Sequence, residues 1–238
     1  MNFISGLQKR DALGVLQAVS TPKHAFDYDV EGNRGRVDRG SINNIVSKQD
    51  QSRYYWPQWR AAAQGAHAQA VMCSYPAVGG VPSCSNKKFL DGILRGAFKF
   101  NGLVVTDCGA LEDAAFFAYV ENQAAAGTNA SLALQAAVAL RSGVNLNCGG
   151  WYARWLPTAV EEGLVTTEEL DSSFATLWGV AFELGLFDGS EYDSLNASDV
   201  DTAASRRLAL MTAVHSQVLL KNVNRCGMPL LIDLKPHY

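Results

Sequence analysis

Four short apolar runs stand out along the chain, and apolar residues recur at helical spacing in the segments between them. Three of the runs are rich in valine and are bounded by Gly, Pro or polar residues, which is typical of strands buried in a parallel sheet. Strands that alternate with helices in this way predict βαβ units, and therefore an α/β fold with a parallel sheet. The runs lie at 13–19, 68–73, 103–105 and 144–146.

Helix signals fill the segments between the runs. Apolar spacing predicts helices at 50–66, 89–98 and 131–141. A capping box formed by Thr166 and Glu169 predicts another helix that reaches about Leu184, and a glycine follows it as a stop signal. The chain turns polar after Gly189, which predicts a surface linker. A helix-like stretch and an apolar VLLKN then indicate the start of a further unit.

Polar side chains follow each predicted strand. Lys23 and His24 follow the first run, Tyr75 the second, Asp107 the third and Asn147 the fourth. Because parallel strands end at one edge of a sheet, we expect these groups to converge there. A mixture of donors and acceptors suits a polyhydroxylated ligand. A carboxylate at that edge could stabilise or attack a carbon that gains positive charge.

Each of these residues also has a simpler structural interpretation. Asp107 could cap the helix that follows its strand. Tyr75 could pack with its hydroxyl in water, Lys23 could be a solvated loop residue, and His24 could be a core histidine. Their combination at one predicted edge favours a site.

Composition excludes several classes of protein. The net charge of −3 provides no basic field for nucleic acid. No apolar run approaches the roughly 18 to 20 residues of a membrane span, so we expect no membrane partner. The first residues lack the pattern of a signal peptide. The five cysteines are scattered without a CxxC pair, which disfavours a zinc site, and we expect neither a metal nor a cofactor.

Several motifs in a fixed order carry a more specific signal. VMCSY, GVPSC, ILRG and VVTDC occur between residues 71 and 108, preceded by PKH and followed by SGVNLNCGG, LGLFDG and VLLKN. This series resembles glycoside hydrolase family 3 in its β-xylosidase-like branch. The resemblance covers roughly residues 5 to 222.

The resemblance implies a fold and a domain order. The family joins a TIM-like barrel to an α/β sandwich. We therefore expect a partial TIM-like (β/α) barrel, with parallel strands alternating with helices. Residues 1–189 would be the C-terminal part of the barrel domain. Residues 190–238 would be a linker and the beginning of a truncated sandwich domain.

The resemblance also implies a reaction, the hydrolysis of O-glycosyl bonds with retention in carbohydrate catabolism, by an exo-β-xylosidase-like enzyme. Asp107 matches the nucleophile, and Lys23 and His24 match residues that bind sugar hydroxyls. Tyr75 matches a residue beside the nucleophile. Arg39 is our choice for a family arginine in the same subsite, with Arg36 as the rival.

Other implications of the resemblance concern substrate and compartment. The substrate would be a β-linked xyloside, arabinoside or glucoside, and the sequence does not choose among them. Members of this branch are mostly secreted, where disulfides form. Pairs among Cys73, Cys84, Cys108 and Cys148 are then possible, with the pairing open.

Departures from the family pattern keep alternatives open. Asn145 and Asn147 stand where the family has aspartates, and no residue is marked as the proton donor, including Glu112 and Asp113. We therefore expect a glycosidase whose catalytic machinery is incomplete in this chain. The alternative is a non-catalytic carbohydrate-binding remnant. A Schiff-base enzyme using Lys23 is the third interpretation.

Overall fold

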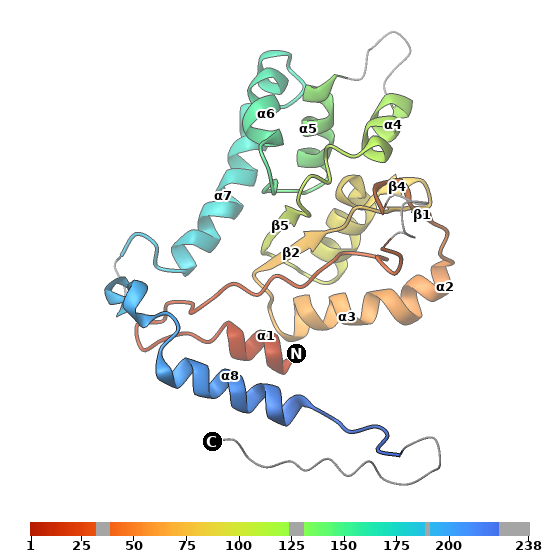
Figure 1. Cartoon of the computed structure of the whole chain (residues 1–238). Coiled ribbons are helices and arrows are strands. Elements are labelled where there is room, and N and C mark those ends of the chain that lie inside the picture. Colours follow the sequence, from red (N-terminus) through yellow and green to blue (C-terminus); the bar gives the residue numbers. More distant parts are fainter. Residues whose placement is uncertain (32–38, 124–130, 189–190, 224–238) are drawn as a thin grey trace. The chain divides into compact units, whose positions relative to one another are not determined.

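The computed structural model describes residues 1–31, 39–123, 131–188 and 191–223 of the chain (Figure 1). The chain divides into two compact units, Met1–Asp188 and Gly189–Tyr238. The first unit contains the sheet and is the part that bears on function.

A parallel sheet forms the centre of the first unit. Strands β2 (Ala70–Cys73) and β5 (Leu103–Thr106) pair in parallel. Parallel bridges from Ala25 to Cys73 and from Val105 to Leu146 extend the pairing on both sides. The predicted α/β fold is confirmed, because parallel strands alternate with helices as in a partial (β/α) barrel.

The predicted first strand at 13–19 is wrong. Leu13 in this run is 82% exposed. The segment that runs beside β2 is 20–25 instead, where the Met72 N–H donates to the Pro22 carbonyl at 3.2 Å. Its sequence STPKHA has little apolar character and contains a proline that lacks an N–H, so hydrophobic patterning could not detect it.

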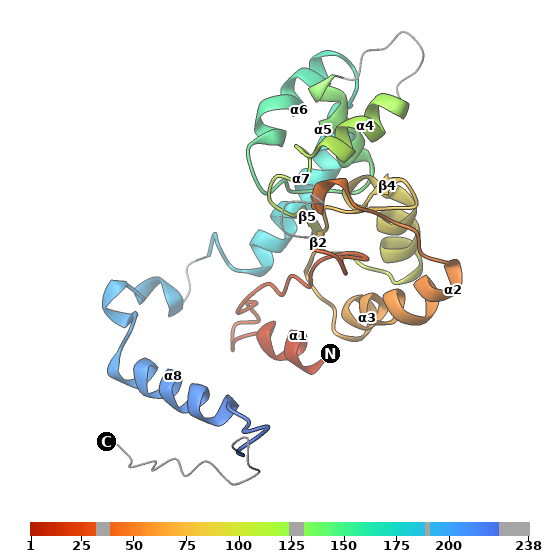
Figure 2. The same ribbon diagram turned by 45° about the vertical axis from the view of Figure 1, so that its right-hand side comes forward.

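Helices surround the sheet in the order in which they follow the strands (Figures 1 and 2). A continuous helical stretch at 48–65 lies on the β2 side, and α5, α6 and α7 lie together on the β5 side (Figures 1 and 2). The helical elements are α1 (Asn2–Leu7), η1 (Arg39–Ser41), α2 (Lys48–Asp50), η2 (Gln51–Tyr55), α3 (Trp56–Arg60), η3 (Ala61–Gly65), η4 (Ser83–Ser85), η5 (Lys88–Ala97), α4 (Ala114–Gln123), α5 (Leu132–Arg141), α6 (Trp151–Glu161) and α7 (Thr167–Glu183), followed in the second unit by η6 (Glu191–Ser194), η7 (Ala197–Asp199) and α8 (Ala203–Ser216).

The helices predicted from spacing and caps are confirmed, whereas α1, α4 and α6 were not predicted. α4 reads as a nearly continuous apolar stretch, AAFFAYV, whose pattern does not separate helix from strand. α6 contains Pro157, a residue that normally ends a helix. Both helices depend on packing against their neighbours rather than on a local signal.

A small three-stranded sheet combines one strand that precedes β2 in the chain with two that follow it. It consists of β1 (Asn43–Asn44), β3 (Ala77–Val78) and β4 (Val81–Pro82). β3 and β4 form a two-residue hairpin at Gly79 and Gly80, whose φ angles of 60° and 83° suit glycine. After this hairpin the chain returns to the end of β2, where Ser83 is hydrogen-bonded to Ser74 at 2.9 Å and Cys84 is disulfide-bonded to Cys73.

Candidate active site

Asp107 lies immediately after β5, at the edge of the sheet where the strands end. Its backbone N–H donates to the Cys73 carbonyl at 2.9 Å, which continues the ladder with β2. Its carboxylate oxygen Oδ2 lies 3.2 Å from His24 Nε2. The two side chains are 13% and 23% exposed, so the pair is largely shielded from water but reachable. The next helix begins only at Ala114, so Asp107 is not its N-cap.

The two oxygens of the Asp107 carboxylate have different partners. Oδ1 accepts a hydrogen bond from the Cys108 backbone N–H at 2.8 Å. Oδ2 faces the imidazole of His24. Backbone on one side and a side chain on the other fix the plane of the carboxylate, and this suits a group that must reach one atom of a ligand.

His24 reaches Asp107 from the segment 20–25, the edge of the sheet next to β2. Its ring packs edge to face with Tyr28 at 4.9 Å between centroids. Lys23 and His24 both line a hollow of about 700 Å³ between this segment and the helical stretch 48–65. The structure therefore brings His24 to Asp107, and it places Lys23 at the adjoining hollow.

Tyr75 lies beside the same carboxylate. Its side chain is 8% exposed, and its hydroxyl donates to the Cys108 carbonyl at 2.6 Å. Its ring lies 6.1 Å from that of Tyr28. The Tyr75 hydroxyl therefore holds the peptide that follows Asp107, and it is not simply solvated.

The structure gives a backbone position, but no side-chain position, for the predicted subsite arginine, Arg39. Arg39 begins η1, but its side chain is outside the described part of the structure. Arg36 lies outside the described residues altogether. The subsite role of either arginine stays a prediction.

Asn147 has a structural task at the predicted edge. Its side chain is 7% exposed, and its Nδ2 donates to Thr106 Oγ1 at 3.2 Å. Its Oδ1 accepts from the Trp151 N–H at 2.8 Å, at the first turn of α6. Both ends of the amide are therefore used to join strand and helix, so the expectation that it serves a ligand is not supported by its contacts.

An acidic cluster that sequence reasoning did not single out borders the same hollow. Asp27 is 4% exposed, and burial is the largest cause that raises the pKa of its carboxyl. The Tyr55 hydroxyl donates to the Asp29 carboxylate, and this bond raises the pKa of Tyr55. Asp27 and Asp29 lie in a loop and Tyr55 lies in the helical stretch 48–65, so no hydrophobic periodicity indicates that they form a cluster. The sequence signal for them is two aspartates, three and five residues after His24.

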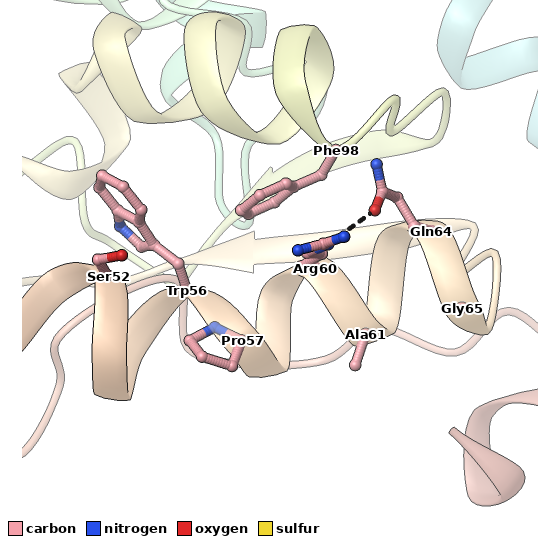
Figure 3. Close-up of a pocket in the computed structure, with 8 residues that line it drawn as sticks. All are labelled: Ser52, Trp56, Pro57, Arg60, Ala61, Gln64, Gly65 and Phe98. Atoms are coloured by element: carbon pink, nitrogen blue, oxygen red, sulfur yellow. Dashed lines mark hydrogen bonds between the residues drawn. The ribbon is translucent and has the colours of Figure 1, made fainter.

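Another face of the helical stretch 48–65 carries a second hollow of about 430 Å³. Figure 3 shows Trp56 and Arg60 from the helix facing Phe98, with Arg60 hydrogen-bonded to Gln64 at 3.0 Å. Its described lining includes a guanidinium but no carboxylate. This lining also has no imidazole that could activate the Ser52 hydroxyl, so the strand-end site, with its carboxylate and imidazole, is the candidate active site.

Two disulfide bonds flank Asp107. Cys73 in β2 is bonded to Cys84, and Cys108 is bonded to Cys148. The structure thus selects one pairing from those that the sequence left open. Cross-links of this kind are typical of proteins from oxidising compartments.

The described residues contain no group of three or more His, Cys, Asp or Glu side chains arranged to hold a metal ion. Among the same residues, no helix has the length and apolar character that crossing a membrane requires.

Comparison with known sequences identifies relatives of the chain. A probable exo-1,4-beta-xylosidase of Aspergillus clavatus is 37% identical over 228 residues, which is 93% of this chain and 28% of the relative. A probable exo-1,4-beta-xylosidase of Neosartorya fischeri is 38% identical over 228 residues, which is again 93% of this chain and 28% of the relative. The chain thus spans 28% of the length of these curated relatives.

Solved structures give the same result. A GH3 exo-beta-xylosidase (XlnD), in complex with a xylobiose aziridine activity based probe, has a TM-score of 0.77 and 32% identity over 92% of this chain and 28% of its own. A beta-glucosidase from Listeria innocua has a TM-score of 0.67 and 28% identity over 88% of this chain and 28% of its own. Residues 1–179 match the glycosyl hydrolase family 3 N terminal domain. The family resemblance is confirmed: the chain belongs to glycosyl hydrolase family 3.

Proposed function

We propose that this chain contributes the nucleophile side of a retaining β-glycosidase of the exo-β-xylosidase type. The observation that carries the proposal is the Asp107 carboxylate at the end of β5, held by the Cys108 N–H and 3.2 Å from His24. The relatives named as probable exo-1,4-beta-xylosidases support the same class of reaction.

The reaction would use a strand-end carboxylate whose neighbour His24 also lines the 700 Å³ hollow. Asp107 Oδ2 attacks the anomeric carbon while the glycosidic C–O bond breaks, and a covalent glycosyl-enzyme forms. A carboxylic acid protonates the leaving oxygen and then takes a proton from the water that releases the sugar. Two inversions leave the configuration retained. We assign this acid/base role to none of the described residues.

The other residues at the site bind and position. His24 and Lys23 would donate hydrogen bonds to sugar hydroxyls from the wall of the 700 Å³ hollow. Tyr75 would hold the peptide after the nucleophile through the Cys108 carbonyl. Arg39 would add positive charge in the same subsite.

We place β-xylosides first among the substrates, ahead of arabinosides and glucosides, because of the relatives' names. We place the enzyme outside the cell, and its two disulfides support this.

The domain order belongs to the same proposal. Residues 1–189 would be the C-terminal part of the barrel domain, and residues 190–238 a linker and the beginning of an α/β sandwich. Since the chain spans 28% of its relatives, activity of these 238 residues alone would be incomplete.

Hydrolysis of aryl β-linked xyloside, arabinoside and glucoside by the protein and by its Asp107→Ala variant tests the function. Loss of the nucleophile should lower kcat/KM by about 10³-fold or more. Asp171→Asn, which changes an exposed carboxylate on α7, is the control. NMR of the first sugar released from the β-xyloside should show the β-anomer. Sugar binding without any hydrolysis would favour the non-catalytic remnant.

A further inference from the structure

Cys108, the residue after Asp107, has three contacts at the site. Its N–H donates to Asp107 Oδ1 at 2.8 Å, and its carbonyl accepts from the Tyr75 hydroxyl at 2.6 Å. Its sulfur is bonded to Cys148. Three anchors on one residue therefore fix the peptide that orients the carboxylate.

Backbone hydrogen bonds hold Cys148 in place. Its N–H donates to Thr106 Oγ1 at 3.0 Å, and its carbonyl accepts from the Gly109 N–H at 3.1 Å. Asn147 beside it is bonded to Thr106 and to the start of α6. The disulfide thus fastens the turn after β5 to the neighbouring strand and helix, across 40 residues of sequence.

The two disulfides have different surroundings. Cys73 and Cys84 are 0% and 1% exposed and belong to the core, and β2 is held by its ladder as well. Cys108 lies at the exposed surface, in a turn with fewer backbone bonds. The Cys108–Cys148 bond therefore has the larger share in fixing its own segment.

We infer that Cys108 is a positioning residue for Asp107, and that its disulfide with Cys148 keeps Oδ2 directed at His24. This inference rests on the proposed function in one respect, since orientation of the carboxylate affects rate only if Asp107 is the nucleophile. Without the disulfide, the peptide and the carboxylate can turn. A misplacement of about 1 Å can lower a rate by about 10²-fold.

The test compares the protein with its Cys108→Ser/Cys148→Ser variant. We expect kcat to fall by about 10-fold or more, with KM within about twofold. Thr166→Ala controls for lost stability, because it removes a helix cap in α7 and should leave turnover per folded molecule unchanged. A folded double variant with the kcat of the unaltered protein would overturn the inference.

A second readout does not depend on activity. The chain has four histidines, so the ring-proton NMR signals of His24 can be assigned with a His24→Gln variant. These signals should shift in the double variant and in Asp107→Asn, and unchanged His24 signals in the double variant would contradict the inference. If the unaltered protein hydrolyses no glycoside while the signals still shift, the proposed function fails and the positioning by Cys108 stands.

If the double variant does not fold, reduction of the unaltered protein tests the same inference. One dithiothreitol transfers two electrons and two protons to the cystine, which gives two thiols and the cyclic disulfide of the reagent. Mass mapping of alkylated thiols should show Cys108 and Cys148 opening first. The rate should fall as they open and return on reoxidation. A constant rate in their reduced form would overturn the inference.

Discussion

The half-buried side chain of Arg95 carries a positive charge next to an asparagine. Its guanidinium donates to the carbonyls of Gly102 and Gly143 at 2.9 and 3.3 Å and to Asn145 Oδ1 at 2.8 Å. Burial lowers the pKa of the Arg95 guanidinium, although the Coulombic attraction of Asp91 opposes this. A neutral amide thus occupies the position nearest to a poorly solvated cation.

Asn145→Asp should stabilise the chain. A carboxylate at this position would turn the 2.8 Å contact into a charge-assisted hydrogen bond. The Val104 N–H would still have its acceptor, and the Ser173 hydroxyl could donate where it now accepts. We expect a gain of about 1–2 kcal/mol in the free energy of unfolding, measured in urea at pH 7. A loss of stability would show that the carboxylate is too poorly solvated there, and Asn145→Ser serves as the matched control without either charge or amide.

Asp27 should make stability depend on pH. Burial raises the pKa of its carboxyl above the ordinary value of 3.8, so the folded state holds the proton more tightly than the unfolded state. The contribution of Asp27 to the free energy of unfolding is therefore fully present below about pH 4. It is lost as the pH rises through the pKa of Asp27 in the folded state. Asp27→Asn should remove this loss. Thermal unfolding at pH 4 and pH 7 should show a smaller difference in Tm for the variant, and an equal difference would contradict the assignment.

At the scale of elements, the start of α7 has a reciprocal cap. The Thr166 hydroxyl accepts from the Glu169 N–H at 3.2 Å, and Glu169 Oε2 accepts from the Thr166 N–H at 3.0 Å. Thr166→Ala should lower the free energy of unfolding by about 1 kcal/mol, whereas Thr166→Ser should be close to neutral. Chemical denaturation measures both. Equal losses in the two variants would show that the hydroxyl does not cap the helix.

The same element shows what could be predicted from sequence. Its cap, its length and its glycine stop are local signals, and so the helix was predicted closely. The segment 20–25 has no such signal, because Pro22 lacks an N–H for the ladder and most of the other residues are polar. α6 also escaped prediction, since its Pro157 is tolerated only through tertiary packing.

The candidate site was predictable to a similar degree. Asp107 follows a strand with a clear pattern, and its place at the sheet edge follows from parallel topology. His24 was expected there for the wrong reason, since its predicted strand lay several residues earlier. The bond from Tyr75 to the Cys108 carbonyl and the role of Asn147 depend on distances that no spacing encodes.

At the scale of the whole molecule, α7 leaves a row of aromatic rings uncovered in the first unit. The Trp178 ring lies 5.3 Å from that of Phe174 and 5.3 Å from that of Phe187, and Phe182 is 60% exposed. Exposed apolar patches of this kind mark surfaces that bind other protein. The 238-residue chain should therefore self-associate when it is isolated.

Light scattering at increasing concentration measures this association. Phe182→Glu/Phe187→Glu should shift the chain toward the monomer mass, because two charges then interrupt the row. Ser172→Glu adds a charge at an exposed position of α7 outside the row and should change little. If the unaltered chain is monomeric and binds no hydrophobic dye, the exposed aromatic patch does not drive self-association.

The nucleophile is tested most directly by trapping its covalent intermediate. A 2-deoxy-2-fluoro-xyloside with an activated leaving group needs little acid assistance, so it can label the protein even where the proton donor is lacking. Mass mapping of the labelled protein should locate one fluoroxylosyl group on the peptide that contains Asp107, and Asp107→Ala should take up none. A label on any other residue, or turnover of xylosides by Asp107→Ala at the rate of the unaltered protein, would contradict the account.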